Sequence, residues 1–163
     1  MKLIKLTRGK QTIVDDEDYD ELNKYKWQAL YNNNNYYAVR TVGEKGNTLR
    51  KQCRMHHVII GTPLGMETDH INGNGLDNRK ANLRVCTHME NGRNRRISKG
   101  KRFKGIHKHG NGFRVKLKIN KKNRFFGTYP TEREAAWLYN KLAVMYFGKF
   151  ARLNGIPNIV EVP

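Results

Sequence analysis

The chain has few of the residues on which small secreted and membrane proteins depend. Of its 163 residues, two are cysteine and four are proline. Cys53 and Cys86 show no disulfide-framework spacing, so a reducing compartment is expected. No run of about 18 apolar residues occurs, and no apolar stretch of signal-peptide type follows Met1. These absences predict a cytoplasmic protein without a membrane partner.

Acidic residues are scarce in the last part of the chain. Residues 92–163 carry 18 lysines and arginines against three acidic residues, and so contribute +15 to the formal net charge of +18. A local cationic excess of this size attracts polyanions such as a phosphate backbone. Mixed charge would serve solubility better, so a nucleic-acid partner is favoured over a merely solvated surface.

Apolar residues make up 37% of the chain, which is too few for one large core. We expect an α+β fold of small modules. They are an N-terminal α/β leader over residues 1–50, a central module over 51–96, a basic linker over 97–102, a sheet-and-helix module over 103–154 and a tail over 155–163. Residues 11–14 predict a strand, 15–22 an acidic helix and 32–35 a loop tip. The leader shows no catalytic constellation, so we expect from it a scaffold or an auxiliary DNA contact.

The last module predicts a three-stranded antiparallel sheet. From Phe113 to Ile119, apolar residues strictly alternate with Arg114, Lys116 and Lys118. This alternation requires a strand with one buried face and one cationic face. A preceding strand over 103–107 and a returning strand over 124–129, which follows a hairpin turn over 121–123, complete the sheet.

One helix should pack on this sheet. Thr131 and Glu134 form a capping box that begins the helix, and Gly148 supplies its stop. The apolar residues that recur at helical spacing are Ala135, Leu138, Leu142 and Tyr146.

The central module contains the polar residues that carry chemistry. Asp69-His70-Ile71-Asn72-Gly73-Asn74-Gly75 is followed by Asn82-Leu83-Arg84-Val85 and by Thr87-His88-Met89-Glu90-Asn91. We expect a strand over 67–71, a loop over 72–78, a strand over 83–86 and then a helix, because Thr87 and Glu90 form a second capping box.

Asp69 and Asn91 can supply two oxygen ligands to one divalent ion, and such ligands suit Mg²⁺ or Mn²⁺ better than zinc. A bend at the loop is expected to turn both Asp69 and His70 toward the helix. His70, neutral at physiological pH, can then take a proton from a water that attacks phosphorus. Asn82 is expected to orient either the loop or the imidazole.

Other polar residues near the motif have simpler explanations. His57 and His88 are candidates for supporting the site, although a packed or surface histidine explains each of them. Asp77 and Asn78 are expected to shape the loop rather than bind metal. Cys53, His56, Cys86 and His88 form a conceivable zinc set, but the spacing at 86–88 is cramped, so zinc is not expected.

These residues resemble the ββα-metal motif of HNH nucleases. The string from Asp69 to Asn78, with Asn82 after it, is similar in particular to bacteriophage HNH homing endonucleases. The resemblance implies a site-specific endonuclease that hydrolyses a phosphodiester bond, by nicking or by double-strand cleavage, in the host cytoplasm. It implies that Asp69 and Asn91 bind the metal, that His70 is the general base and that Asn82 orients the site. Zinc-binding cysteine pairs, common in HNH proteins, are absent here.

Residues 103–154 resemble an AP2 DNA-binding domain. The resemblance rests on Gly105-Ile106, Phe126-Gly127-Thr128-Tyr129, Glu134-Ala135-Ala136, Tyr139-Asn140 and Phe147-Gly148. It implies a sheet that sits in a major groove of double-stranded DNA. Plant AP2 sheets usually present tryptophans among their arginines, and this cationic face does not, so no base preference is carried over.

Eight basic residues are the predicted DNA contacts: Arg93, Arg95, Arg96, Lys104, Arg114, Lys116, Lys118 and Arg124. The linker is explained equally well as a solvated tether or as a segment along phosphates in a minor groove. One site per chain and no evident dimer helix favour a monomer, and no small-molecule substrate is expected. Two alternatives stay open: a catalytically silent DNA-binding regulator built on the same modules, and RNA binding or cleavage.

Overall fold

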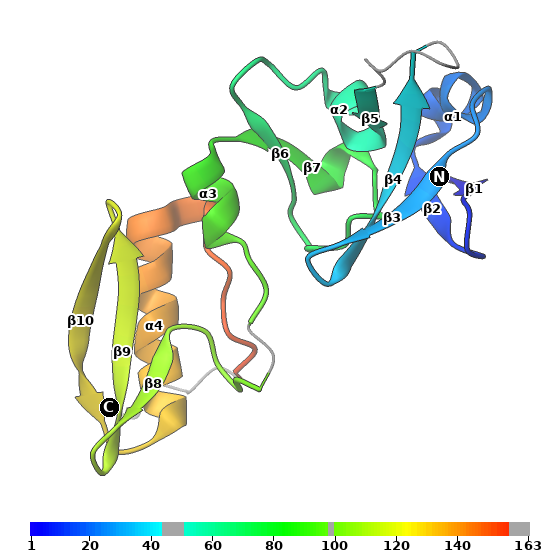
Figure 1. The fold of residues 1–163 in the computed structure, drawn as a ribbon. Helices are drawn as coiled ribbons and strands as arrows, with labels where there is room; N and C mark the ends of the chain where they lie inside the picture. Colours follow the sequence, from blue (N-terminus) through cyan, green and yellow to red (C-terminus); the bar gives the residue numbers. More distant parts are fainter. Residues whose placement is uncertain (44–50, 98–99, 157–163) are drawn as a thin grey trace. The chain divides into compact units, whose positions relative to one another are not determined.

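The computed structural model describes residues 1–43, 51–97 and 100–156. The chain forms two compact units, residues 1–91 and 92–163. Figure 1 shows helices together with strands in each unit, which confirms the α+β class. The predicted boundary after residue 50 falls within the first unit. The predicted linker over 97–102 lies wholly within the second unit. Parts of the predicted leader, linker and tail, namely 44–50, 98–99 and 157–163, lie outside the described residues.

The first unit begins with a two-stranded hairpin of β1 (Lys2–Lys5) and β2 (Gln11–Val14). The helix α1 (Asp16–Asn23) follows. Both β2 and this acidic helix agree with the sequence prediction. A three-stranded sheet comes next, in the order β3 (Gln28–Asn32), β4 (Asn35–Val42) and β5 (Lys51–Arg54). The loop tip between β3 and β4 narrows to Asn33 and Asn34, both with positive φ, as a two-residue hairpin turn requires.

One apolar core joins the predicted leader to the central segment. Its buried members are Ile4, Leu6, Val14, Leu22, Trp27, Ala29, Ala38 and Met55. The Trp27 indole nitrogen also donates to the Leu22 carbonyl at 2.8 Å. Because Met55 belongs to the short helix α2 (Met55–Ile60), the leader and the central segment bury their apolar surface together.

The central segment has the predicted order of strand, loop, strand and helix. β6 (Glu67–His70) pairs antiparallel with β7 (Leu83–Cys86), and α3 (His88–Arg93) follows. A short 3₁₀ turn (Lys80–Asn82) precedes β7. The capping box is formed: the Glu90 amide donates to the Thr87 hydroxyl at 3.3 Å, and the Thr87 amide donates to the Glu90 carboxylate at 2.8 Å.

The second unit is a three-stranded antiparallel sheet with one long helix. β8 (Ile106–His109), β9 (Gly112–Ile119) and β10 (Lys122–Tyr129) lie in the order β10-β9-β8. The helix α4 (Glu132–Phe147) covers one face of this sheet, and a 3₁₀ turn (Gly148–Phe150) ends it (Figure 1). The β9–β10 turn is Asn120–Lys121, one residue earlier than predicted. Both residues have positive φ, which asparagine tolerates.

The buried face of α4 agrees in part with the predicted stripe, because Ala135 is buried and Leu138 and Leu142 pack, partly buried, against the core. The buried residues are Ala135, Ala136, Tyr139, Ala143 and Phe147. The small alanines let the helix approach the sheet closely, whereas the predicted Tyr146 stays 43% exposed. Among the helices that the structure describes, none has the length and apolar character to cross a bilayer.

Candidate active site

The β6–β7 hairpin positions the two central residues of the motif. Asp69 lies opposite Arg84 and His70 lies opposite Leu83, and each motif residue is only 5% exposed. Neighbouring strand residues point to opposite faces, so the two side chains diverge. The His70 ring packs edge-on against His56 of α2, at 4.8 Å between centroids, whereas the sequence-based expectation turned it toward α3.

The Asp69 carboxylate is held by a guanidinium from the neighbouring strand. The Arg84 Nε and Nη2 atoms lie 2.9 and 2.6 Å from Oδ2 of Asp69. The side chains of Arg84 and Asp69 are 12% and 6% exposed, so the pair is largely shielded from water. The charge of the predicted metal ligand is therefore balanced by an arginine of the same hairpin.

The His70 imidazole sits in a site that favours its neutral form. Its Nε2 lies 3.0 Å from Oδ1 of Asn78. Burial lowers the pKa of His70, against the opposing effects of the Asn78 hydrogen bond and of the nearby Asp69 and Asp77 carboxylates. A neutral imidazole is the form that accepts a proton.

A second histidine supports the ring of His70. His56 is 2% exposed, and burial lowers its pKa to about 2, so it stays neutral across the physiological range. Its Nδ1 finds no hydrogen-bond partner among the described residues. Tyr37 of β4 approaches both imidazoles, at 5.9 Å from His56 and 6.0 Å from His70. The predicted supporting residue His57 is exposed and stacks edge-on against His56 at 4.6 Å, which in turn packs on His70.

Glu67 connects β6 to α3 through two side-chain contacts. The Asn91 amide nitrogen donates to Oε2 of Glu67 at 2.6 Å, and Nδ1 of His88 lies 2.7 Å from Oε1. Because its nitrogen faces Glu67, the amide of Asn91 presents its oxygen away from that carboxylate. His88, a predicted supporting residue, therefore meets Asn91 through Glu67, which sequence reasoning did not single out.

Asn82 ties together the two ends of the loop over residues 71–78. Its Oδ1 accepts from the Asn72 amide at 3.0 Å, and its Nδ2 donates to Oδ1 of Asn72 and to the Asp77 carbonyl at 3.1 and 2.8 Å. Of the two predicted targets, the loop is the one that Asn82 holds. Asp77 also shapes the loop, since it accepts from Asn72 and binds Arg79.

The donor set suits a hard divalent cation. Glu67 and Asp69 are alternate residues of β6 and share one face of it. Asn91 is anchored on Glu67, so its amide is held on the face of β6 that also carries the Asp69 carboxylate. Carboxylate and amide oxygens are Mg²⁺ or Mn²⁺ ligands. Across residues 1–43, 51–97 and 100–156, no three side chains of His, Cys, Asp or Glu gather as a metal-binding group.

The N-terminal hairpin reaches the site directly. Ile13 and Asp77 form a parallel bridge, in which the Ile13 amide donates to the Leu76 carbonyl at 2.9 Å and the Asn78 amide donates to the Ile13 carbonyl at 2.8 Å. The neighbouring Thr12 hydroxyl is fully buried between Leu76 and Asn78. No local pattern could have indicated Thr12, because its contacts lie far along the chain. Glu67 could have been found, since it alternates with Asp69 on a predicted strand.

The second unit presents a cationic sheet face, as the alternation predicts. The register puts Phe125 opposite Lys116 and His107 opposite Arg114, so these side chains share the face that α4 leaves open. Phe125 is 58% exposed, and the Arg114 guanidinium lies 5.4 Å from its ring. Arg114 also hydrogen-bonds His109. Sequence reasoning missed Phe125 because the strand register was not known.

The other predicted DNA contacts have different environments. Arg124 is exposed but lies opposite Leu117, on the face that bears the core rather than on the cationic face. The Lys104 ammonium donates to the carbonyls of Arg93 and Arg95, and burial lowers its pKa to about 8. It is thus engaged within the protein.

The remaining arginines of the basic segment divide in two. Arg93 packs its guanidinium over the Phe147 ring at 4.8 Å. Arg95 and Arg96 are exposed. Of these three arginines, Arg95 and Arg96 have the surface position expected of a phosphate contact.

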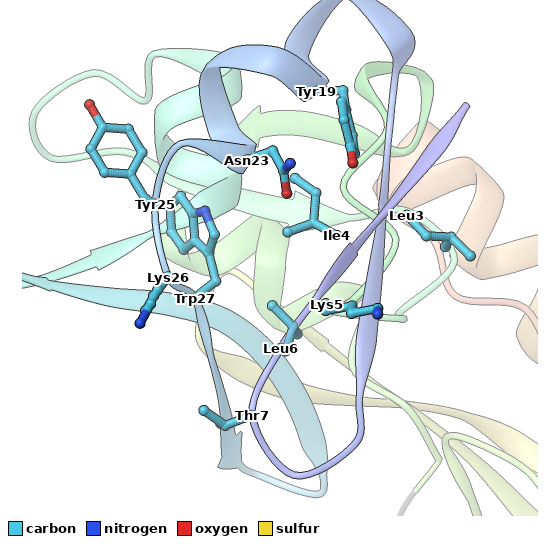
Figure 2. Close-up of a pocket in the computed structure, with 10 residues that line it drawn as sticks. All are labelled: Leu3, Ile4, Lys5, Leu6, Thr7, Tyr19, Asn23, Tyr25, Lys26 and Trp27. Carbon is cyan, nitrogen blue, oxygen red and sulfur yellow. The ribbon is translucent and has the colours of Figure 1, made fainter.

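A pocket beside β1 lies apart from these residues. Figure 2 shows its lining, in which the Trp27 ring lies between Tyr25 on one side and Ile4 on the other. As far as the described residues go, the lining contains no histidine, cysteine or carboxylate.

Comparisons with known proteins agree with the site. A profile of the HNH endonuclease family matches residues 55–93, which span α2, the β6–β7 hairpin and α3. A protein named as an uncharacterized HNH endonuclease, from Acanthamoeba polyphaga mimivirus, is 32% identical over 155 residues, covering 93% of this chain and 79% of that protein. No solved structure matches the chain. With a motif-bearing hairpin and a relative that extends over both units, the chain belongs to the HNH endonuclease family.

Proposed function

We propose that this nuclease is a metal-dependent endonuclease of the homing type, which binds double-stranded DNA as a monomer and nicks one strand. The observation that carries the proposal is a buried His70 whose neutral form is favoured, on the strand β6 that also carries the Asp69 carboxylate and anchors the Asn91 amide through Glu67. A base next to hard oxygen ligands is what hydrolysis of a phosphodiester requires.

His70 acts as the general base. It takes a proton from the attacking water, whose oxygen then bonds to phosphorus while the 3′ oxygen leaves. Burial supports this role because it keeps the imidazole free of its own second proton near pH 7. Packing against His56 restricts the ring to one orientation. A restricted base is effective because little reorganisation is needed before proton transfer.

Asp69 and Asn91 would hold one Mg²⁺ or Mn²⁺ ion. The bound ion would stabilise negative charge that grows on the phosphate and on the leaving oxygen. Glu67 assists by fixing the amide of Asn91 so that its oxygen is available. Arg84 balances the Asp69 carboxylate when the ion is absent, and keeps the ligand in place on the hairpin.

The open sheet face of the second unit anchors the duplex. Arg114, Lys116 and Lys118 project from one side of β9, at every second residue. Such a strand fits a major groove, where arginine and lysine contact phosphates and base edges. Phe125 adds an apolar surface of the kind that contacts a thymine methyl group. Arg95 and Arg96 are the further phosphate contacts.

Plasmid relaxation tests this proposal. Supercoiled DNA is incubated at low salt with wild type, His70→Gln or His88→Gln, in the presence of Mg²⁺, Mn²⁺ or EDTA. We expect open-circular product from wild type only with metal, and none from His70→Gln. His88 is the matched control, because it is 80% exposed and glutamine still donates to Glu67.

The outcomes separate the alternatives. Cleavage by His70→Gln at the wild-type rate would disprove the base assignment. Tight duplex binding by a wild type that never nicks, even on a randomised-site library, would favour the silent regulator. If RNA outcompeted duplex DNA at matched salt, RNA rather than DNA would be assigned as the substrate.

A further inference from the structure

A buried chain of hydrogen bonds connects the N-terminal hairpin to His70. The Thr12 hydroxyl donates to the Leu76 carbonyl at 2.8 Å. The Asn78 amide nitrogen donates to that hydroxyl at 2.7 Å, and Oδ1 of Asn78 lies 3.0 Å from Nε2 of His70. Thr12 and Asn78 are both 0% exposed, so water cannot substitute for any member of the chain.

The direction of each hydrogen bond follows from the first one. A hydroxyl has one proton, and the Leu76 carbonyl can only accept, so the Thr12 proton is committed to it. Toward Asn78 the Thr12 oxygen is therefore an acceptor, which turns the amide nitrogen of Asn78 to Thr12 and its oxygen to His70. Since that oxygen can only accept, Nε2 of His70 must carry the proton.

The backbone fixes this arrangement. Ile13 donates to the Leu76 carbonyl and accepts from the Asn78 amide, at 2.9 and 2.8 Å. These two bonds hold β2 alongside the loop, so Thr12 cannot move away from Asn78 without breaking backbone pairing. A neutral imidazole carries one proton, which leaves the lone pair on Nδ1.

We propose that Thr12 and Asn78 are positioning residues that hold His70 in its Nε2–H tautomer and make Nδ1 the atom that accepts the proton. This rests on the proposed role of His70 as general base. When Nδ1 takes a proton from water, the O–H bond breaks, the N–H bond forms and the ring becomes an imidazolium. Its Nε2–H still points at the same Asn78 oxygen, so no partner has to reorient. The N-terminal hairpin, which has no reactive group of its own, thereby contributes to the reaction.

Thr12→Val tests this chain of hydrogen bonds, because valine keeps the shape of threonine and removes its hydroxyl. The amide of Asn78 then loses its preferred orientation, and nicking should slow about tenfold, the factor that one buried hydrogen bond of about 1.4 kcal/mol supports. DNA affinity should not change. Thr12→Ser, which restores the hydroxyl, should recover most of the rate. Thr68→Val is the matched control. Thr68 is 7% exposed, and its hydroxyl pairs with Thr62, which takes no part in the hydrogen bonds from Thr12 to His70.

The tautomer itself is read by NMR on the full-length, metal-free protein. Histidine labelled with ¹⁵N is observed by long-range ¹H–¹⁵N correlation at about pH 8, where ordinary imidazoles are neutral. The His70 signals are assigned by their loss in His70→Gln. We expect Nε2 protonated and Nδ1 unprotonated in wild type, Thr12→Ser and Thr68→Val, and a mixture or the Nδ1–H form in Thr12→Val.

Three results would overturn the proposal: an Nδ1–H tautomer in wild type, an unchanged tautomer in Thr12→Val, or equal slowing by Thr68→Val and Thr12→Val. A wild type that shows the expected tautomers and still fails to nick would leave the positioning intact and remove the proposed function instead. If wild type nicks through His70 and Thr12→Val nicks at the same rate, the proposed function stands and the positioning role of Thr12 is removed.

Discussion

Replacement of Arg84 by methionine should destabilise the first unit and make its stability depend strongly on divalent metal. Methionine retains the length of the side chain and removes the charge. The change leaves the Asp69 carboxylate, 6% exposed, without the guanidinium that now lies 2.6 Å away. If Asp69 is a metal ligand, a bound ion can replace the missing positive charge.

The expected size follows from burial. Removing one partner of a buried ion pair costs about 3–5 kcal/mol. For a unit of residues 1–91, each kcal/mol corresponds to about 4–8 °C in melting temperature, so a loss of at least about 12 °C is expected. A ligand at 100 times its dissociation constant restores about 2.7 kcal/mol. In wild type the gain should be smaller, because the ion competes with the guanidinium for the same carboxylate.

Arg79→Met is the matched control. Arg79 binds Asp77 through two nitrogens, at 2.7 and 2.6 Å, in the same unit. Its side chain is 39% exposed, so solvent screening makes the expected loss much smaller than that of Arg84→Met. Both variants and wild type are melted by calorimetry in EDTA and in Mn²⁺. Only Arg84→Met should gain more from the metal than wild type does. Equal metal-induced gains in all three proteins would refute the assignment of Asp69 as a ligand.

Three further predictions address packing, DNA binding and pH. A Cβ at Gly75 would clash with the backbone oxygen of Tyr36 in β4, so Gly75→Ala should cost about 1–3 kcal/mol in a thermal melt. Gly155→Ala, whose Cβ meets nothing within 4 Å, should cost far less, and an equal loss would contradict the close approach. Arg114→Ala should weaken duplex binding and lower the salt slope by about 1, whereas Arg124→Ala on the other sheet face should not; identical slopes would remove β9 from the interface. Burial lowers the pKa of His56 from 6.5 to about 2, so the unfolded state binds that proton first. The free energy of unfolding should therefore fall below pH 6.5, by up to about 1.4 kcal/mol per pH unit, and less steeply in His56→Phe; equal slopes would exclude His56 as the cause.

The role of the N-terminal hairpin changes the view of this nuclease fold. The profile of the family begins at residue 55, yet the loop that carries Asn78 is held by β2 through two backbone bonds. Removal of residues 1–50 would therefore expose the loop and the apolar core around Met55. The motif and the hairpin act as one folded unit.

Local features were determined by the sequence alone. Alternation over residues 113–119 predicts β9 and its cationic face, because a strand has a period of two. The two capping boxes predict where α3 and α4 begin, since the hydroxyl and carboxylate satisfy amides of the first turn. The spacing from Asp69 to Asn91 predicts a base and two hard ligands, because residue type carries that chemistry.

Tertiary structure alone decided how distant residues meet. Thr12 reaches Asn78 only because a shared core and a parallel bridge bring β2 to the loop. Phe125 joins the cationic face, and Arg124 leaves it, because a two-residue turn with positive φ sets the register of β10. Register and long-range packing depend on the whole fold, whereas periodicity and capping depend on residues a few positions apart.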